Sequence, residues 1–131
     1  MSTVLTDIGR REGGYIISEA GGATGMRSRD RGTLKAGAVG LSGMVLAQLT
    51  ADKKLVPMAA TAADPDTGSA TAYAVLFTSA DASTADQPVV FHARDCEVND
   101  RELVWPAGIS APNKAAAITA LAAKGIIVRT K

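Results

Sequence analysis

Between residues 44 and 98, apolar positions fall into short runs of strand length, separated by polar or glycine-containing turns. The runs at residues 44–49 and 55–59 enclose the tetrapeptide ADKK, which predicts a two-stranded hairpin. Further strands are predicted at residues 72–80 and 88–98. The polar segments at residues 59–71 and 81–87 predict loops. Neither face of the run at 88–98 is cleanly apolar, so we expect both of its faces to be partly covered.

A helical pattern begins after residue 109. The alanine-rich segment 111–124 predicts a single helix, because alanine is the strongest helix former. Ser110 is placed to cap its N-terminus, Pro112 suits the first turn, and Gly125 can end it. The apolar stripe of this helix is predicted at four positions, Ala115, Ile118, Leu121 and Ala122. Residues 126–129, IIVR, predict a final strand.

The first thirty residues have a different character. Residues 1–14 contain few apolar side chains, namely Val4, Leu5 and Ile8, and end in two glycines. Residues 15–18, YIIS, are typical of a short strand, but the glycines that follow leave the backbone flexible. We therefore predict a flexible N-terminal arm at residues 1–30 and a β-rich domain at residues 31–131. The predicted fold is mainly β, a small barrel-like or clip-like domain with one helix near the C-terminus and an extended arm.

Length and composition limit the partners of the chain. A chain of 131 residues fits one domain, and its few aromatic residues indicate a thin core that a partner subunit would reinforce. The net charge is +1 with basic and acidic residues interleaved, which disfavours nucleic-acid binding. No apolar run reaches the ~20 residues of a membrane span. The first residues also lack a signal-peptide pattern, so we expect synthesis in a cytosol.

Candidate catalytic and metal-binding residues are scarce. His92 is the single histidine, and no nucleophile motif accompanies it, so we expect a structural role. One histidine and one cysteine are too few for a convincing zinc site. We expect Cys96 to be buried and Asp95 and Glu97 to be surface charges. The sequence therefore predicts no enzyme activity, no metal and no cofactor.

Four ordered segments carry a family resemblance. They are ISEAGG with SRD, LSGMVLAQLT with KKLVP, ARDCEVN with LVWPAG, and AAITALAAKGIIVR. In this order and spacing, over residues 15–129, the chain resembles the head decoration proteins of lambda-type tailed bacteriophages. The alanine-rich helix followed by glycine and IIVR carries most of the resemblance. The loops at residues 59–71 and 81–87 have no clear counterpart in the shorter family members.

The resemblance implies a capsid-stabilising protein of the virion. Such proteins form homotrimers on the outer surface of the expanded head, at local threefold positions, and clamp neighbouring major capsid subunits. In the host cytoplasm, during assembly, the arm would become ordered on the shell by adding a strand to a sheet. The residues expected in the capsid-binding arm are Val4, Leu5, Ile8, Tyr15, Ile16, Ile17, Arg27 and Arg29. The residues expected to have structural roles are Trp105, Pro106 and Gly125.

A second hypothesis is a small β-rich module that recognises a glycan or another surface. It is disfavoured by the scarcity of aromatic residues, because sugar sites usually stack on exposed rings. No direct contact with nucleic acid or membrane is expected under either hypothesis.

Overall fold

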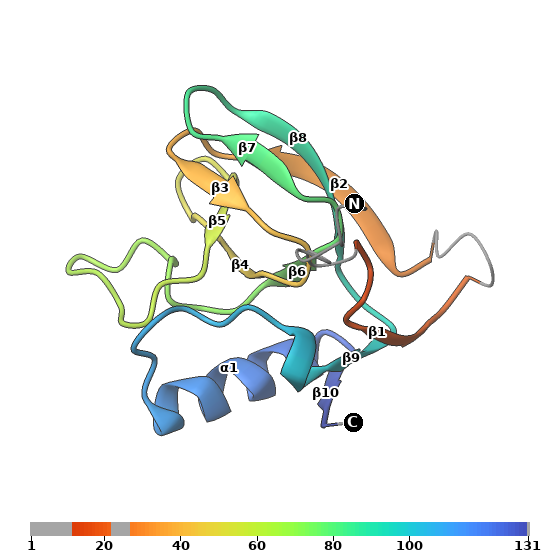
Figure 1. The fold of residues 1–131 in the computed structure, drawn as a ribbon. Helices are drawn as coiled ribbons and strands as arrows, with labels where there is room; N and C mark the ends of the chain where they lie inside the picture. The colour runs from red at the N-terminus through yellow and green to blue at the C-terminus, as the bar shows by residue number, and fades with distance from the viewer. Residues whose placement is uncertain (1–11, 22–26, 131) are drawn as a thin grey trace, which may run out of the picture.

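The computed structural model describes residues 12–21 and 27–130, and these form a β-rich body with one α-helix (Figure 1). A short 3₁₀ helix, η2 (Asp100–Glu102), precedes the helix α1 (Ala111–Ala123). The described strands are β1 (Ile16–Glu19), β2 (Arg29–Leu34), β3 (Ala38–Gly40), β4 (Val45–Gln48), β5 (Leu55–Pro57), β6 (Ala74–Leu76), β7 (Ala80–Ala82), β8 (Gln87–His92), β9 (Cys96–Asn99) and β10 (Ile126–Arg129). The expectation of a mainly β, barrel-containing fold with one helix near the C-terminus is confirmed.

Five strands close a small barrel in the order β2, β5, β4, β6, β8. The strands β2 and β8 run antiparallel over their full length, from Arg29 opposite His92 to Leu34 opposite Gln87. The barrel closes where β2 pairs in parallel with β5 at Leu34 and Leu55. The two-stranded sheet of β3 and β7 extends from the barrel. At Gly40 of β3 a side chain would lie 2.5 Å from Leu76, so glycine permits this close approach.

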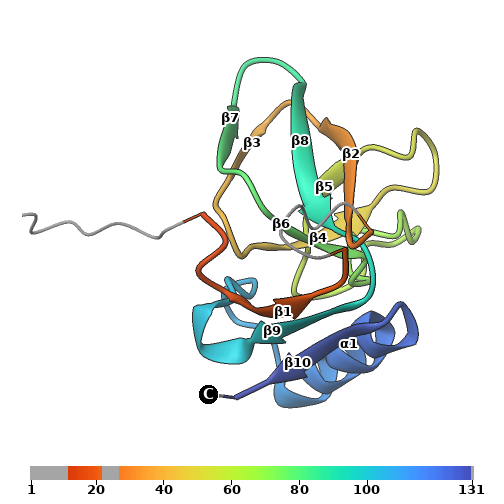
Figure 2. The same cartoon turned by 90° about the vertical axis from the view of Figure 1, so that its right-hand side faces the viewer.

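A second sheet, ordered β1, β9, β10, lies beside the barrel, and α1 packs next to its strand β10 (Figure 2). The strand β1 pairs antiparallel with β9, and β10 pairs with β9 in parallel. Ile16 faces Val98 and Ser18 faces Glu97, so the register shifts at Ile17, as in a β-bulge.

Alternation along the barrel strands divides the interior into two clusters. Leu46 and Leu76 point into the barrel, whereas Val45 and Val75, one position earlier on each strand, pack toward the second sheet. This explains why strands in this chain lack a cleanly polar face. The second cluster is completed by buried residues of β1, β9, α1 and β10 and of the segments next to them: Tyr15, Cys96, Val98, Leu103, Ala117, Leu121 and Ile126.

The local element predictions are confirmed in several places. β4 and β5 form the predicted antiparallel hairpin, and β10 lies within residues 126–129. Ser110 accepts a hydrogen bond from the Asn113 backbone at 3.2 Å, as an N-cap does. The helix stripe is different from the prediction: Leu121 is buried, but Ala117 replaces Ala115 and Ala122.

Two predicted strands are each divided in the structure. The run 88–98 becomes β8 and β9, which belong to different sheets. The chain turns between them at Asp95, whose φ is 51°. The run 72–80 holds β6 and only the first residue of β7, so part of the predicted loop 81–87 is strand. In both cases the strand ends where the chain changes to another pairing partner, and that partner lies far away in the sequence.

The first described residues also differ from the prediction of an arm that reaches residue 30. Tyr15 is only 2% exposed, because its ring fills the second cluster. Ile16 and Ile17 belong to β1, and Arg29 begins the barrel strand β2. The predicted arm residues Val4, Leu5 and Ile8 lie outside the described residues.

Candidate functional site

The junction between β1 and the barrel contains a chain of four polar side chains, which we call the Glu19 network. The Tyr15 hydroxyl lies 2.6 Å from Nδ1 of His92, and Nε2 of His92 bonds to Oε2 of Glu19. Arg29 donates to both oxygens of the same carboxylate, from Nη2 at 2.6 Å and from Nε at 3.1 Å. The network thus joins β1 to the barrel strands β2 and β8.

Aromatic rings enclose this network. The Arg29 guanidinium lies over the Phe77 ring, 4.1 Å from its centroid, which favours the cation. The rings of Tyr15 and Phe77 both approach the His92 ring edge-on. His92 is fully buried, and Glu19 and Arg29 expose only 14% and 25% of their side chains. The charged pair is therefore held in a largely water-excluded setting.

Burial and charge determine the protonation of these groups. Burial lowers the pKa of His92, although its bond to Glu19 opposes the shift. The hydrogen bond from Arg29 lowers the pKa of Glu19, and burial raises the pKa of Tyr15. A neutral imidazole that donates from Nε2 to the carboxylate and accepts at Nδ1 from the tyrosine satisfies every contact. Because both nitrogens of His92 are bonded and the ring is inaccessible, the arrangement suits a structural role, as the sequence predicted.

The sheet beside this network offers open strand edges. Within residues 12–21 and 27–130, β1 pairs only with β9, so β1 and β10 are the outer strands. Such edges present backbone donors and acceptors to another strand. Of the predicted arm residues, Ile16 and Ile17 lie on the edge strand β1, at its bulge. Their side chains are partly buried.

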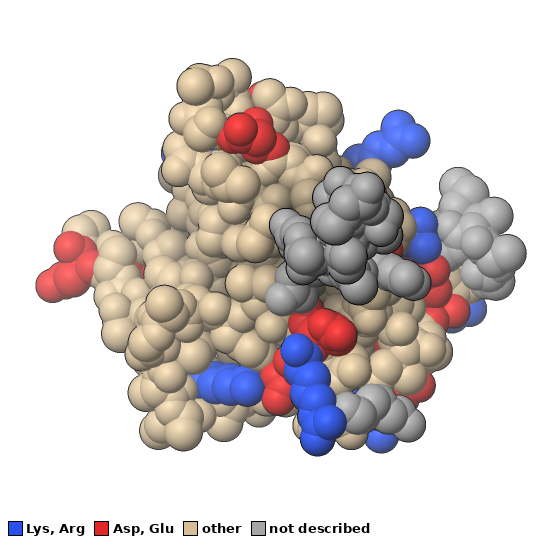
Figure 3. Space-filling model, in the orientation of Figure 1, with Lys and Arg blue, Asp and Glu red and all other residues tan. Residues whose placement is uncertain are grey.

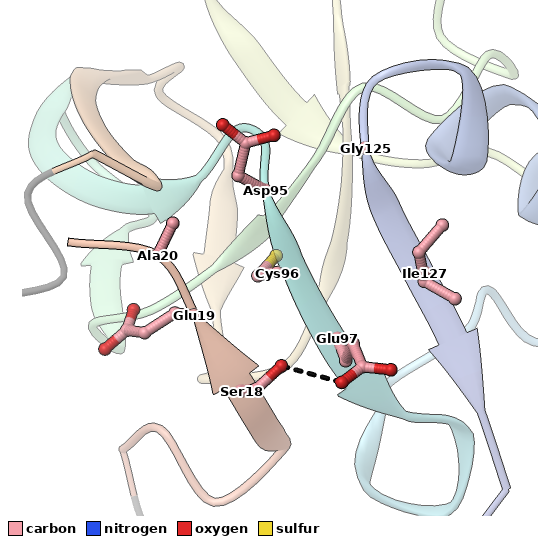
Figure 4. A pocket seen from close by; sticks show the side chains of 8 residues that line it. All are labelled: Ser18, Glu19, Ala20, Asp95, Cys96, Glu97, Gly125 and Ile127. Carbon is pink, nitrogen blue, oxygen red and sulfur yellow. Dashed lines mark hydrogen bonds between the residues drawn. The ribbon is translucent and has the colours of Figure 1, made fainter. Parts of the chain in front are cut away.

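A shallow pocket of about 410 Å³ lies on the outer face of this sheet. Figure 4 shows Ser18, Glu97 and Ile127 across its three strands, with Asp95 at one end. Ser18 donates to Glu97 at 2.8 Å, and Glu97 also bonds to Arg129. The acidic groups of the pocket therefore have partners within the chain.

The described residues do not gather the ligands of a metal ion. No group of three or more histidine, cysteine or acidic side chains is placed to bind one among them. Burial raises the pKa of Cys96 to about 12, which makes its thiol unreactive. This is the buried cysteine that the sequence predicted. In the same part of the chain, no helix is long and apolar enough to cross a membrane.

An apolar area is exposed near the place where the described chain begins. Val39 and Leu41 are 53% and 44% exposed. Figure 3 shows few charged side chains over β3 and β4 on this face. The Gly13 amide donates to the Ser42 hydroxyl at 3.0 Å, which fixes the segment before β1 beside Leu41. Two exposed apolar side chains are ordinary on a protein surface and do not by themselves mark a contact site.

The other residues singled out from the sequence lie within the body. Arg27, near Asp95 at 3.5 Å, is largely exposed. Trp105 is partly buried against the second cluster and donates to Asp100 at 2.7 Å, and Pro106 follows it. Gly125 has a φ of 84° at the end of α1 and packs against the Asp95 backbone. The Glu19 network itself was missed, because no sequence motif relates residues 15, 19, 29 and 92.

Comparison with known proteins provides the family. The family model of the bacteriophage lambda head decoration protein D matches residues 6–126, nearly the whole chain. No curated protein matches the chain. The matched range includes the Glu19 network, both clusters and the C-terminal helix. The chain therefore belongs to the head decoration protein D family of bacteriophage lambda, as the resemblance implied, and is a structural component of a phage head.

Proposed function

We propose that this protein is a cement subunit that binds as a homotrimer to the outer surface of the expanded head. In this proposal it occupies local threefold sites, contacts the major capsid protein and stabilises the shell against the pressure of packaged DNA. The observation that carries the proposal is the family match over residues 6–126. The described residues support it further, because the single histidine is buried and bonded on both nitrogens. We infer that the chain has no catalytic activity, and that it reaches the shell from the host cytoplasm.

We place the attachment site at the N-terminal segment and the neighbouring edge of β1. The apolar residues Val4, Leu5 and Ile8 precede the point where Gly13 is fixed to the body. The open edge of β1 provides backbone groups that can continue a neighbouring sheet. Three such segments on one trimer would bind with high avidity, because the second and third contacts are intramolecular.

Binding to purified heads tests this function. The protein is mixed with empty expanded heads and with unexpanded heads, and bound protein is measured by co-sedimentation. We expect saturable binding to the expanded heads alone, together with a higher melting temperature of the shell in calorimetry. Absence of binding, or binding that leaves the melting temperature unchanged, contradicts a cement function.

A variant with serine at Val4, Leu5 and Ile8 tests the attachment site. Loss of three apolar contacts per subunit should weaken binding by at least about tenfold. The matched control places serine at three exposed apolar positions of the body, Val39, Leu41 and Ile127. Equal weakening of both variants would reject a specific role for the N-terminal segment.

The alternative of a glycan-binding module finds little support in the aromatic residues. Tyr15 and Phe91 are buried. Cations lie over the other rings: Arg29 over Phe77, Lys114 over Trp105 and Lys124 over Tyr73. A stacking sugar would have to displace one of these side chains. Binding on a glycan array, with no binding to heads, would favour this alternative.

A further inference from the structure

The Glu19 network is the main polar connection between β1 and the barrel. Tyr15 immediately precedes β1 and Glu19 is its last residue, and both side chains bond to the imidazole of His92. The partners on the other side, Arg29 and His92, belong to β2 and β8 and face each other in the barrel register. Any movement of β1 away from the barrel therefore has to break all of these contacts together.

The network is electrically neutral only in one protonation state. One carboxylate is balanced by one guanidinium, and the imidazole between carboxylate and tyrosine carries no charge. The charged and titratable groups around His92 are Tyr15, which immediately precedes β1, Glu19 from β1 and Arg29 from β2. Cys96 from β9 lies near Tyr15 and Glu19 and is protonated. A proton added to His92 would leave a net positive charge in a buried site, which is unfavourable.

Protonation also reverses the direction of a hydrogen bond. Nδ1 of the neutral imidazole accepts a hydrogen bond from the Tyr15 hydroxyl, and the hydroxyl oxygen lies 2.6 Å from Nδ1. In the imidazolium form Nδ1 becomes a donor, so the hydroxyl has to turn and its hydrogen loses its present acceptor. At lower pH, protonation of Glu19 would weaken both bonds from Arg29, which is three-quarters buried.

We propose that the Glu19 network is an acid-sensitive latch, which holds β1 on the barrel at neutral pH and releases it as the pH falls. This property belongs to the isolated subunit and does not depend on attachment to a head. The strand it controls leads directly into the N-terminal segment, so the latch would set the position from which that segment leaves the body.

The direction of the pH effect follows from linkage. When β1 is released, His92 and Glu19 meet water and regain their ordinary pKa values, 6.5 and 4.5. In the latched state both pKa values are lower, so the released state binds protons more readily. Latching is therefore complete above the ordinary pKa of His92. It weakens as the pH falls below that value, and weakens again below the ordinary pKa of Glu19.

Nuclear magnetic resonance on the full chain tests the latch, because the single histidine gives unambiguous imidazole signals. Amide exchange is measured from about pH 7.5 to about pH 5 and corrected for intrinsic rates. We expect the protection of the β1 amides to fall about tenfold for each unit by which the His92 pKa is lowered. The amides of β4 should keep their protection. Loss at β1 should begin as the pH falls below the ordinary pKa of His92 and level off once the latched imidazole is protonated. An unchanged ratio between β1 and β4, or a loss of protection unrelated to that protonation, would overturn the proposal.

The variant His92→Gln separates titration from hydrogen bonding. A glutamine amide can donate to Glu19 and accept from Tyr15, but it has no proton to gain in this pH range. The pH dependence of β1 protection should disappear in this variant and persist in the control Asp52→Asn, which changes the exposed pair of Asp52 with Lys35. Persistence in His92→Gln would reject the latch. Should that variant not fold, the titration of the natural protein decides.

Discussion

Leu121 is the side chain through which α1 is anchored to the second cluster. It is fully buried, whereas Leu41 of the barrel side is 44% exposed. We predict that Leu121→Ala lowers the free energy of unfolding by about 3 kcal/mol, because it removes buried methyl groups and leaves a cavity. The matched change Leu41→Ala should cost less than about 0.5 kcal/mol. Urea unfolding followed by Trp105 fluorescence measures both; similar losses would contradict the assigned burial.

Single residues also show where sequence reasoning reached its limit. The buried state of Cys96 and the structural state of His92 were predicted, since each is the only residue of its type and has no catalytic motif around it. Tyr15 was placed in a flexible arm because glycines precede and follow its short strand. Its burial depends on Val98, which lies in the same buried cluster, and on His92, which bonds to its hydroxyl. Both are more than seventy residues away, so no local pattern reveals them.

The end of α1 depends on the backbone of Gly125. Its φ is 84°, and an added Cβ would lie 3.1 Å from the Asp95 nitrogen. Gly108 also has a positive φ, 75°, but an added Cβ would meet nothing within 4 Å. We predict that Gly108→Ala costs about 1 kcal/mol from the left-handed backbone alone. Gly125→Ala should cost about 2–4 kcal/mol, because the crowded site adds to that strain. Equal losses in urea unfolding would show that the neighbouring turn yields to the added methyl.

Elements were predictable where their signals are local. The cap, proline and alanines of α1 lie within its own sequence, and the hairpin of β4 and β5 is joined by a short turn. The division of residues 88–98 was not predictable from alternation. β8 pairs with the barrel strands β2 and β6, whereas β9 pairs with β1 and β10. The run therefore breaks at Asp95, where the chain passes from one sheet to the other. Pairing partners of that kind are decided by the whole fold.

The described body contains two hydrophobic clusters, and the strands β4 and β6 contribute residues to both. The strand β1 is an outer strand of the three-stranded sheet beside the barrel. The N-terminal boundary of that body is therefore a physical question with two distinct answers. If the arm reached residue 30, as the glycine pattern suggested, residues 15–17 could be removed without loss. If Tyr15 is a core residue, the body begins close to Glu12.

Two truncations distinguish these answers. Deletion of residues 1–11 should change the free energy of unfolding by less than about 0.5 kcal/mol, because it removes none of the core contacts described. Deletion of residues 1–17 also removes Tyr15 and half of β1, and should cost at least about 3–5 kcal/mol. Calorimetry and urea unfolding measure both, with the full chain as reference. Equal stability of the two truncated proteins would show that Tyr15 belongs to the arm and not to the core. It would also contradict the role of the Tyr15 hydroxyl in the Glu19 network.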